Sequence, residues 1–285
     1  MNRGPNTSAD AETILAASDL TVRYHRHDPP VIADQSIALA AGKITALVGP
    51  NGSGKSTMLK TLARQLDHEA GRVLLDGRDV HALSLRELAR NLGILFQEHA
   101  APGGITVEQL VEHGRYPHRG MFDPLSEEDQ GAIDEAFELA GVERLRHRRV
   151  IELSGGQKQL AWIAMVLAQR PAMLLLDEPT TFLDLRHQLE VMRIVERLRD
   201  ERGITIALVL HDLNQAARHC DRLIAMQQGQ IVATGSPWDV LNTQLLQSVF
   251  EVEAEVLYDA DGLPVCVPRS IAGSTAPLQP TEGWP

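Results

Sequence analysis

The glycine-rich segment Gly49–Thr57 constrains the fold of this chain more than any other stretch. It follows the apolar, β-branched run Ile44–Val48, which predicts a buried strand, and it leads into good helix formers up to Arg64. A glycine-rich loop between a strand and a helix allows backbone N–H groups to wrap a phosphate chain. A turn before an ordinary helix does not need the full G-x₄-G-K-[ST] pattern. The residues of this predicted phosphate loop are Gly49, Pro50, Asn51, Gly52, Ser53, Gly54, Lys55, Ser56 and Thr57.

Two side chains of the loop predict the chemistry of the ligand. Lys55 would reach the β- and γ-phosphates of a nucleotide, and the Ser56 hydroxyl would bind Mg²⁺. The helix that starts there adds a favourable partial positive charge at its N-terminus. We therefore expect ATP with Mg²⁺ at this loop.

Two carboxylates follow a second strand. The continuous apolar run Met173–Leu176 is typical of a parallel strand that is covered on both faces, and Asp177 lies where it ends. Ligands gather at the carboxyl ends of such strands, so Asp177 would hold Mg²⁺ beside the phosphate loop. Glu178 would act as the general base on the attacking water. The alternative is a pair of solvated acids that cap a turn, which the preceding apolar residues and Pro179 disfavour.

A third apolar run, Ile204–Leu210, is closed by His211. A lone histidine is more often structural than catalytic, but this one is expected on the same side of the same sheet as Asp177. His211 could therefore contact a γ-phosphate. Gln97 follows another apolar run, Gly93–Phe96, and is a further candidate at this edge.

The alternation of apolar runs with helical patterns predicts an α/β fold, and 285 residues can bury a sizeable core. Residues 17–40 and 72–75 are expected to form a small β lobe, and about 98–167 a helical lobe. We place the domain at 14–268, with residues 1–13 and 269–285 as disordered tails.

Composition excludes several classes of protein. No apolar run reaches the ~18 residues that span a bilayer, so a membrane role would need partner subunits. The net charge of −11 argues against nucleic acid as a partner. Cys220 and Cys266 lack metal-ligand spacing, which suits a reducing cytoplasm. The local cluster Arg144, Arg146, Arg148 and Arg149 is interpreted as a solvated helix end rather than a binding patch.

From about Leu20 to about Phe250 the chain resembles the nucleotide-binding subunit of ATP-binding cassette (ABC) transporters. Gln97 is similar to the family's glutamine-loop residue, Asp184 to its dimer-facing aspartate, and His211 to its switch histidine. Tyr24 lies where the family stacks an aromatic ring on adenine. The signature motif of the family is matched by Leu153, Ser154, Gly155, Gly156 and Gln157.

The resemblance implies a P-loop NTPase core with a mainly parallel sheet, a small antiparallel β lobe and a helical lobe that carries the signature. Ser154 can cap the following helix, whose N-terminus would be an anion site. In the family this site serves the ATP of a second copy, so two chains would hold two ATP molecules head to tail. The catalytic residues would be Glu178, His211 and Gln97, with Ser56, Gln97 and Asp177 as metal ligands. One departure is Leu160, where the family often has arginine.

Finer resemblance favours the importers of iron(III)-siderophores, and by extension of haem or cobalamin. It is carried by Ala161–Met165, Thr180–Leu185 with His187 and Gln188, and His113–His118. It implies membrane permease subunits as partners, a substrate-binding protein as an indirect one, and a peripheral position on the cytoplasmic face of the inner membrane. Some of the apolar residues of segment 98–122, namely Leu110, Val111, Tyr116, Met121 and Phe122, would then line a groove for a short cytoplasmic helix of the permease, and the others would pack within the helical lobe.

Other ATPases with the same motifs remain to be weighed. A DNA-repair or chromosome-organising ATPase needs a long coiled-coil insertion between Gln97 and Ser154, and this chain has no room for one. A translation-factor ATPase would carry two cassettes. A degenerate binding module is opposed by intact Lys55, Asp177, Glu178 and His211. A non-transport ATPase of the iron–sulfur assembly type stays open as the alternative.

Overall fold

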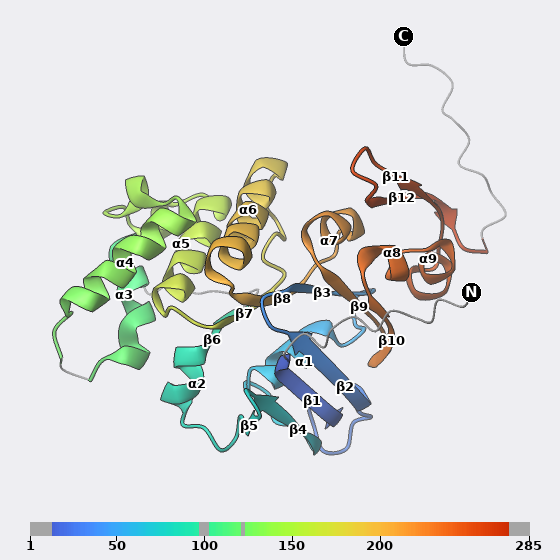
Figure 1. Cartoon of the computed structure of the whole chain (residues 1–285), viewed down its shortest axis with the longest axis horizontal. Helices are drawn as coiled ribbons and strands as arrows, with labels where there is room; N and C mark the ends of the chain where they lie inside the picture. Colours follow the sequence, from blue (N-terminus) through green and yellow to red (C-terminus); the bar gives the residue numbers. More distant parts are fainter. Residues whose placement is uncertain (1–12, 97–102, 121–122, 274–285) are drawn as a thin grey trace, which may run out of the picture.

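The computed structural model describes residues 13–96, 103–120 and 123–273. Its central sheet has six strands in the order β10-β9-β3-β8-β7-β6, and all neighbours pair in parallel except β10 with β9. Figure 1 shows this sheet running through the middle of the molecule, between the helices above it and the β lobe below. The strands are β3 (Ile44–Val48), β6 (Leu92–Leu95), β7 (Met173–Asp177), β8 (Thr205–Val209), β9 (Arg222–Gln227) and β10 (Gln230–Gly235).

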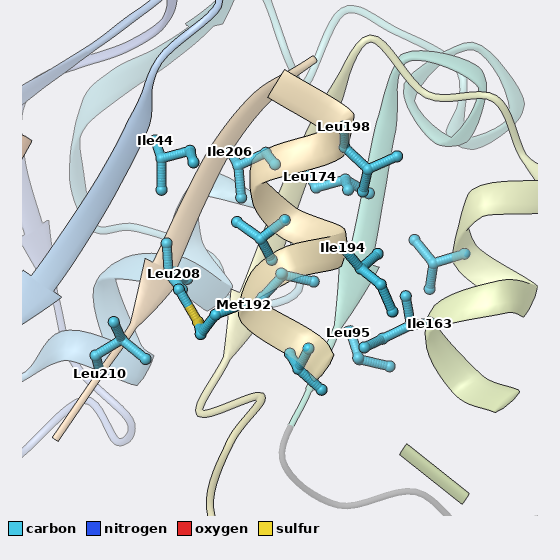
Figure 2. Packing of buried hydrophobic residues seen from close by; sticks show 14 of the residues in the cluster. Ile44, Leu95, Ile163, Leu174, Met192, Ile194, Leu198, Ile206, Leu208 and Leu210 are labelled. Atoms are coloured by element: carbon cyan, nitrogen blue, oxygen red, sulfur yellow. The ribbon is translucent and has the colours of Figure 1, made fainter. Parts of the chain in front are cut away.

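Both faces of the central sheet are buried, which explains the continuous apolar runs of its strands. Ile44, Ala46 and Val48 of β3 face one hydrophobic cluster, and Leu47 faces the other. The first cluster is closed by α6 (Leu185–Arg202) and α7 (Leu213–His219), and Figure 2 shows Met192, Ile194 and Leu198 of α6 among its members. The second is closed by α1 (Lys55–Leu62) and α2 (Leu85–Asn91). The α/β fold class is therefore confirmed.

A separate antiparallel sheet of four strands, in the order β2-β1-β4-β5, packs on the second cluster. It corresponds to the small β lobe that the sequence predicts, although its first strand begins earlier. The strands are β1 (Thr13–Val22), β2 (Ile32–Ala40), β4 (Ala70–Leu75) and β5 (Arg78–Asp79).

The region expected as a helical lobe contains helices throughout its described part, with one isolated bridge between Thr106 and Arg149. It lies at one end of the molecule, in green and yellow in Figure 1. None of the described helices is long and apolar enough to cross a membrane. The elements are α3 (Val107–Glu112), the 3₁₀ turns η1 (His113–His118), η2 (Glu143–Leu145) and η3 (Val150–Glu152), α4 (Glu127–Ala140) and α5 (Gly155–Ala168).

The chain ends in α8 (Pro237–Val240), α9 (Thr243–Phe250) and a hairpin of β11 (Val252–Tyr258) and β12 (Pro264–Ile271). Regular structure therefore extends past the expected boundary at residue 268, where we had predicted a disordered tail. The reason is strand pairing, because Val252 and Glu253 of β11 are matched by Ile271 and Ser270 of β12.

A buried ion pair fastens η1 between two helices. Arg115, which is only 2% exposed, donates from Nε to Asp129 Oδ1 at 2.8 Å and from Nη1 to the carbonyl of Ala168 at 2.8 Å. Hydrogen bonds from Ser126 and Arg115 outweigh the effect of burial, which acts to raise the pKa of Asp129, and the pKa falls to about 2. The contact to Ala168 brings the backbone of η1 close to the end of α5.

This close approach leads to a stability prediction. A Cβ atom on Gly114 would lie 2.1 Å from the Met165 carbonyl oxygen, whereas one on Gly131, in α4, would meet nothing within 4 Å. We expect Gly114→Ala to destabilise the fold by about 1–3 kcal/mol, the usual cost of overpacking. Gly131→Ala should instead stabilise it by about 0.5–1 kcal/mol, because alanine is the better helix former. Urea unfolding of both variants tests the pair, and equal midpoints would contradict the assigned contact.

Candidate functional site: a phosphate loop at the edge of the parallel sheet

The phosphate loop connects β3 to α1, in the strand–loop–helix context that the sequence predicts. Lys55 is the first residue of α1, and its Nζ donates to the carbonyl oxygens of Gly49 and Pro50, each at 2.9 Å. Burial lowers the pKa of Lys55, while the charges of Glu178 and Asp177 act to raise it. The loop therefore holds a desolvated ammonium group whose partners among the described residues are backbone carbonyls, which suits it to a phosphate.

The loop also approaches a neighbouring strand too closely for any side chain at its first residue. A Cβ on Gly49 would lie 2.1 Å from the Met226 carbonyl oxygen of β9. Glycine is therefore required here by the packing of the loop on the sheet, a reason independent of phosphate binding.

Ser56 and Asp177 are brought together as predicted. The Ser56 hydroxyl donates to Asp177 Oδ1 at 2.8 Å, across the gap between α1 and the end of β7. Desolvation raises the pKa of Asp177, against the lowering effect of the Ser56 hydrogen bond. A hydroxyl and a carboxylate oxygen are hard donors of the kind that Mg²⁺ prefers. Within the described ranges, no three His, Cys, Asp or Glu side chains form a metal cluster.

Glu178 and His211 also meet at this edge. His211 Nε2 lies 2.6 Å from Glu178 Oε1, and the Thr181 hydroxyl donates to Glu178 Oε2 at 3.0 Å. His211 lies just beyond β8, which ends at Val209. The backbone of Glu178 is left-handed, with φ of 53°, a strained conformation for a glutamate that tends to occur at functional sites. The sequence predicted that His211 and Asp177 share one side of the sheet, but neither the contact of His211 with Glu178 nor this strain.

The aromatic candidate Tyr24 lies in the loop after β1, beside the phosphate loop. Its hydroxyl is 3.0 Å from Thr57 Oγ1, and its ring remains half exposed. Tyr24, the phosphate loop and Glu178 line one cavity of about 250 Å³. An adenine ring could therefore stack on Tyr24 while its phosphates follow the loop.

The predicted cap of the signature helix is present. Ser154 Oγ accepts from the Gln157 backbone N–H at 3.3 Å, and Gln157 Oε1 accepts from the Ser154 N–H at 3.2 Å. The apolar residues of this helix at i, i+3, i+4 and i+7 spacing, Leu160, Ile163, Ala164 and Leu167, are all buried. Ser154 and Gly155 are exposed, so the N-terminus of α5 is open to an incoming anion.

His187 contacts both the signature and the aspartate loop of its own chain. It donates from its backbone N–H to Asp184 Oδ1 at 2.9 Å, and its Nδ1 lies 2.7 Å from the same oxygen. This backbone hydrogen bond is the main reason why the pKa of Asp184 is lowered. The His187 ring also packs against Gly156 so closely that a Cβ there would lie 2.3 Å from the ring. In the sequence, His187 stands out only as part of a resemblance. The Asp–His spacing of a helix cap could have identified its hydrogen bond with Asp184, but not its packing against Gly156.

The structure does not bring all predicted site residues into one place. The cavity beside the phosphate loop is lined by no residue of the signature. Gln97 lies outside the described residues, so its assignment stays a prediction.

Comparison with known proteins agrees with this geometry. Residues 32–181 match the family description "ABC transporter". The chain is 44% identical to the iron(3+)-hydroxamate import ATP-binding protein FhuC of Bacillus subtilis, covering 89% of this chain and 94% of the relative. It is 42% identical to the ferric enterobactin transport ATP-binding protein FepC of Escherichia coli, covering 92% and 96%. The chain belongs to the ABC transporter family.

A solved structure extends the comparison. It is a dimeric ATP-binding cassette in a post-hydrolysis state with ADP and phosphate bound, 27% identical to this chain, with a TM-score of 0.68 over 78% of this chain and 98% of that one. Family membership confirms the predicted P-loop ATPase core and makes this chain an ATP-binding, ATP-hydrolysing protein.

The two roles of Ser154, helix cap and anion ligand, can be separated. Aspartate also caps helices well, so Ser154→Asp should retain stability, whereas Ser154→Ala should lose about 0.5–2 kcal/mol. The aspartate charge would repel a phosphate at about 4 Å by roughly 1–4 kcal/mol, so ATP turnover should fall about tenfold or more. Thermal unfolding and phosphate release measure the two effects. Wild-type turnover in Ser154→Asp would show that no phosphate approaches this helix.

Proposed function

We propose that this chain is the ATP-hydrolysing subunit of a membrane importer that takes up an iron(III)-siderophore or a related chelate. The observation that carries the ATPase part is the meeting of Ser56 with Asp177 and of Glu178 with His211 beside the phosphate loop. The cargo is inferred from the hydroxamate and enterobactin importers that the chain resembles over most of its length. The alternative remains a non-transport ABC ATPase of the iron–sulfur assembly type.

The phosphate loop and Lys55 would bind the phosphate chain, with the Lys55 ammonium exchanging its carbonyl partners for phosphate oxygens. Ser56, Asp177 and Gln97 would hold Mg²⁺, which supplies positive charge beside the phosphate oxygens when it is bound. Glu178 would accept a proton from the attacking water as its contact with His211 opens. His211 would then stabilise the charge on the transferred phosphoryl group.

The chain would also form a dimer with another copy of itself. The open N-terminus of α5 offers an anion site that its own phosphate loop does not reach, and the similar solved cassette is a dimer. Phe182, 94% exposed, lies on the same loop as Asp184, and the exposed Leu185 is the first residue of α6. A facing subunit that covers these apolar side chains would add burial energy to the head-to-tail pair.

Permease subunits would dock near Gln97, placing the chain at the cytoplasmic face of the inner membrane, with the substrate-binding protein as an indirect partner. Of the apolar residues that follow Gln97, Leu110 and Val111 are buried in the core, whereas Tyr116 is 60% exposed. Met121 and Phe122 lie outside the described residues. Tyr116 is thus the described residue that best supports an apolar anchor for a permease helix.

Removal of the proposed general base, Glu178, tests the mechanism of ATP hydrolysis. Glu178→Gln keeps the shape of the side chain, so ATP should still bind while turnover falls about 10²-fold or more. A stable ATP-bound dimer should then accumulate, visible by size-exclusion chromatography. Near-normal phosphate release would remove Glu178 from the mechanism.

A transport assay distinguishes an importer subunit from a non-transport ABC ATPase. The chain is co-purified with its membrane partner in vesicles, and uptake of ferric hydroxamate and ferric enterobactin is assayed. Tyr116→Asp should abolish uptake but leave ATP hydrolysis by the isolated chain largely intact, because a charge opposes apolar docking. Tyr258→Asp, at a tyrosine of similar exposure on β11, is the matched control and should transport normally. Uptake by Tyr116→Asp at the rate of the control variant would show that Tyr116 is not an anchor for the permease. No uptake of either chelate by the wild type would favour the non-transport ATPase.

A further inference from the structure

A groove with a volume of about 530 Å³ lies between the helical region and α6, and it shares no lining residue with the cavity at the phosphate loop. Its walls come from the end of α4, from η2 and α5 on one side, and from α6 on the other. We call it the arginine groove, after four of its lining residues, Arg144, Arg186, Arg193 and Arg197.

The charge of this groove is opposite to that of the whole chain, which carries −11. Arg186 pairs with Glu190 at 2.9 Å and Arg197 with Glu201 at 3.4 Å, one turn apart on α6, and exposed pairs of this kind are weak. Among the described residues, Arg144 and Arg193 have no hydrogen bond or ion pair. The two unpaired guanidinium groups come from η2 and from α6, so they reach the groove from both of its walls.

The lining below these arginines is apolar. It includes Leu139, Leu145, Leu160 and Ile194, of which all but Leu145 belong to the main hydrophobic cluster. Leu160 is the position where the resemblance to the family leads one to expect arginine. A leucine at this position keeps the lining apolar, so the positive charge of the groove comes from the four arginines at its rim.

An apolar lining, a cationic rim and this volume together fit one class of ligand. Small-molecule sites typically measure about 300–1,000 Å³ and combine apolar walls with a few charged groups. Guanidinium groups prefer carboxylates, sulfonates and phosphates, which they bind in a bidentate manner. The cavity is too small for a folded partner, and the rim disfavours a neutral or cationic ligand.

The arginine groove is also connected to the signature. Gln157, which caps α5 with Ser154, and His187, which packs against Gly156, both line it. A molecule that bridges Arg144 and Arg193 would tie the helical region to α6 and touch both of these supporting residues. A bridge of this kind would oppose any movement of the helical region relative to the core during ATP turnover.

We propose that the arginine groove binds a small organic anion with at least two negative groups and an apolar body, and that this ligand slows ATP turnover. The binding site stands on the geometry alone, while the effect on turnover rests on the proposed function. The two parts are therefore tested separately.

Binding is measured with bis-ANS, a fluorescent probe that carries two sulfonates on apolar rings, in saturating ATP and Mg²⁺ to cover the phosphate loop. Removing the two unpaired guanidinium groups in Arg144→Ala/Arg193→Ala should weaken binding at least tenfold. The control Arg72→Ala/Arg222→Ala removes the same charge from exposed arginines outside the groove and should bind as the wild type does. Thermal unfolding verifies that each variant folds. Equal affinity of the wild type and both variants would overturn the site.

A second comparison tests the charge requirement. N-phenyl-1-naphthylamine has a similar aromatic body and no negative group, so it should bind much more weakly and with no dependence on Arg144 and Arg193. Equal binding of the two probes would show that the groove binds apolar molecules regardless of their charge, which would overturn the proposed ligand class.

The effect on turnover is measured as phosphate release with and without saturating bis-ANS. We expect a several-fold decrease in the wild type and in the Arg72→Ala/Arg222→Ala control, and no decrease in Arg144→Ala/Arg193→Ala. Binding without any decrease would overturn the regulatory half alone. A wild-type chain that binds the probe but hydrolyses no ATP would contradict the proposed function and leave the site standing.

Discussion

Burial of both faces of the parallel strands β3, β7 and β8 is the constraint on which the rest of the structure depends. Helices α6 and α7 cover one face, and α1, α2 and the β lobe cover the other, so the ends of these strands remain open. The strands pair directly and in parallel, so the residues that follow them emerge at one edge. The phosphate loop, Asp177 with Glu178, and His211 are neighbours for this reason, although they are far apart in the sequence.

At this edge each of the ionisable groups has a partner within the chain. Lys55 is bound by carbonyl oxygens, Asp177 by Ser56, and Glu178 by His211 and Thr181. Unpaired charges would be costly at a partly buried site, so a nucleotide must replace these contacts and not simply add to them. The strained backbone of Glu178 is maintained because β7 and the following turn hold it in place.

The helical region is organised by polar contacts of another kind. Arg115 and Asp129 fix η1 against the C-terminal end of α5, and His187 supports the N-terminal end of the same helix through Gly156. Both ends of the signature helix are therefore held by specific neighbours. A change at either end, or in the arginine groove beside it, can reach the signature through the rigid helix between them.

The sequence by itself determined the α/β class, the phosphate loop, the cap of α5 by Ser154 and the pairing of Ser56 with Asp177, because these follow from local patterns and from the rule that parallel strands share an edge. Only the tertiary structure decided the strained backbone of Glu178, the continuation of β12 to Ile271, the buried Arg115–Asp129 pair and the contact of His187 with Gly156. Each of these depends on residues distant in sequence or on backbone torsions, and no local pattern of residues records such contacts. Arg144 illustrates the difference. Its basic neighbours in the sequence led to the prediction of a solvated helix end, whereas the fold places Arg144 across a groove from Arg193.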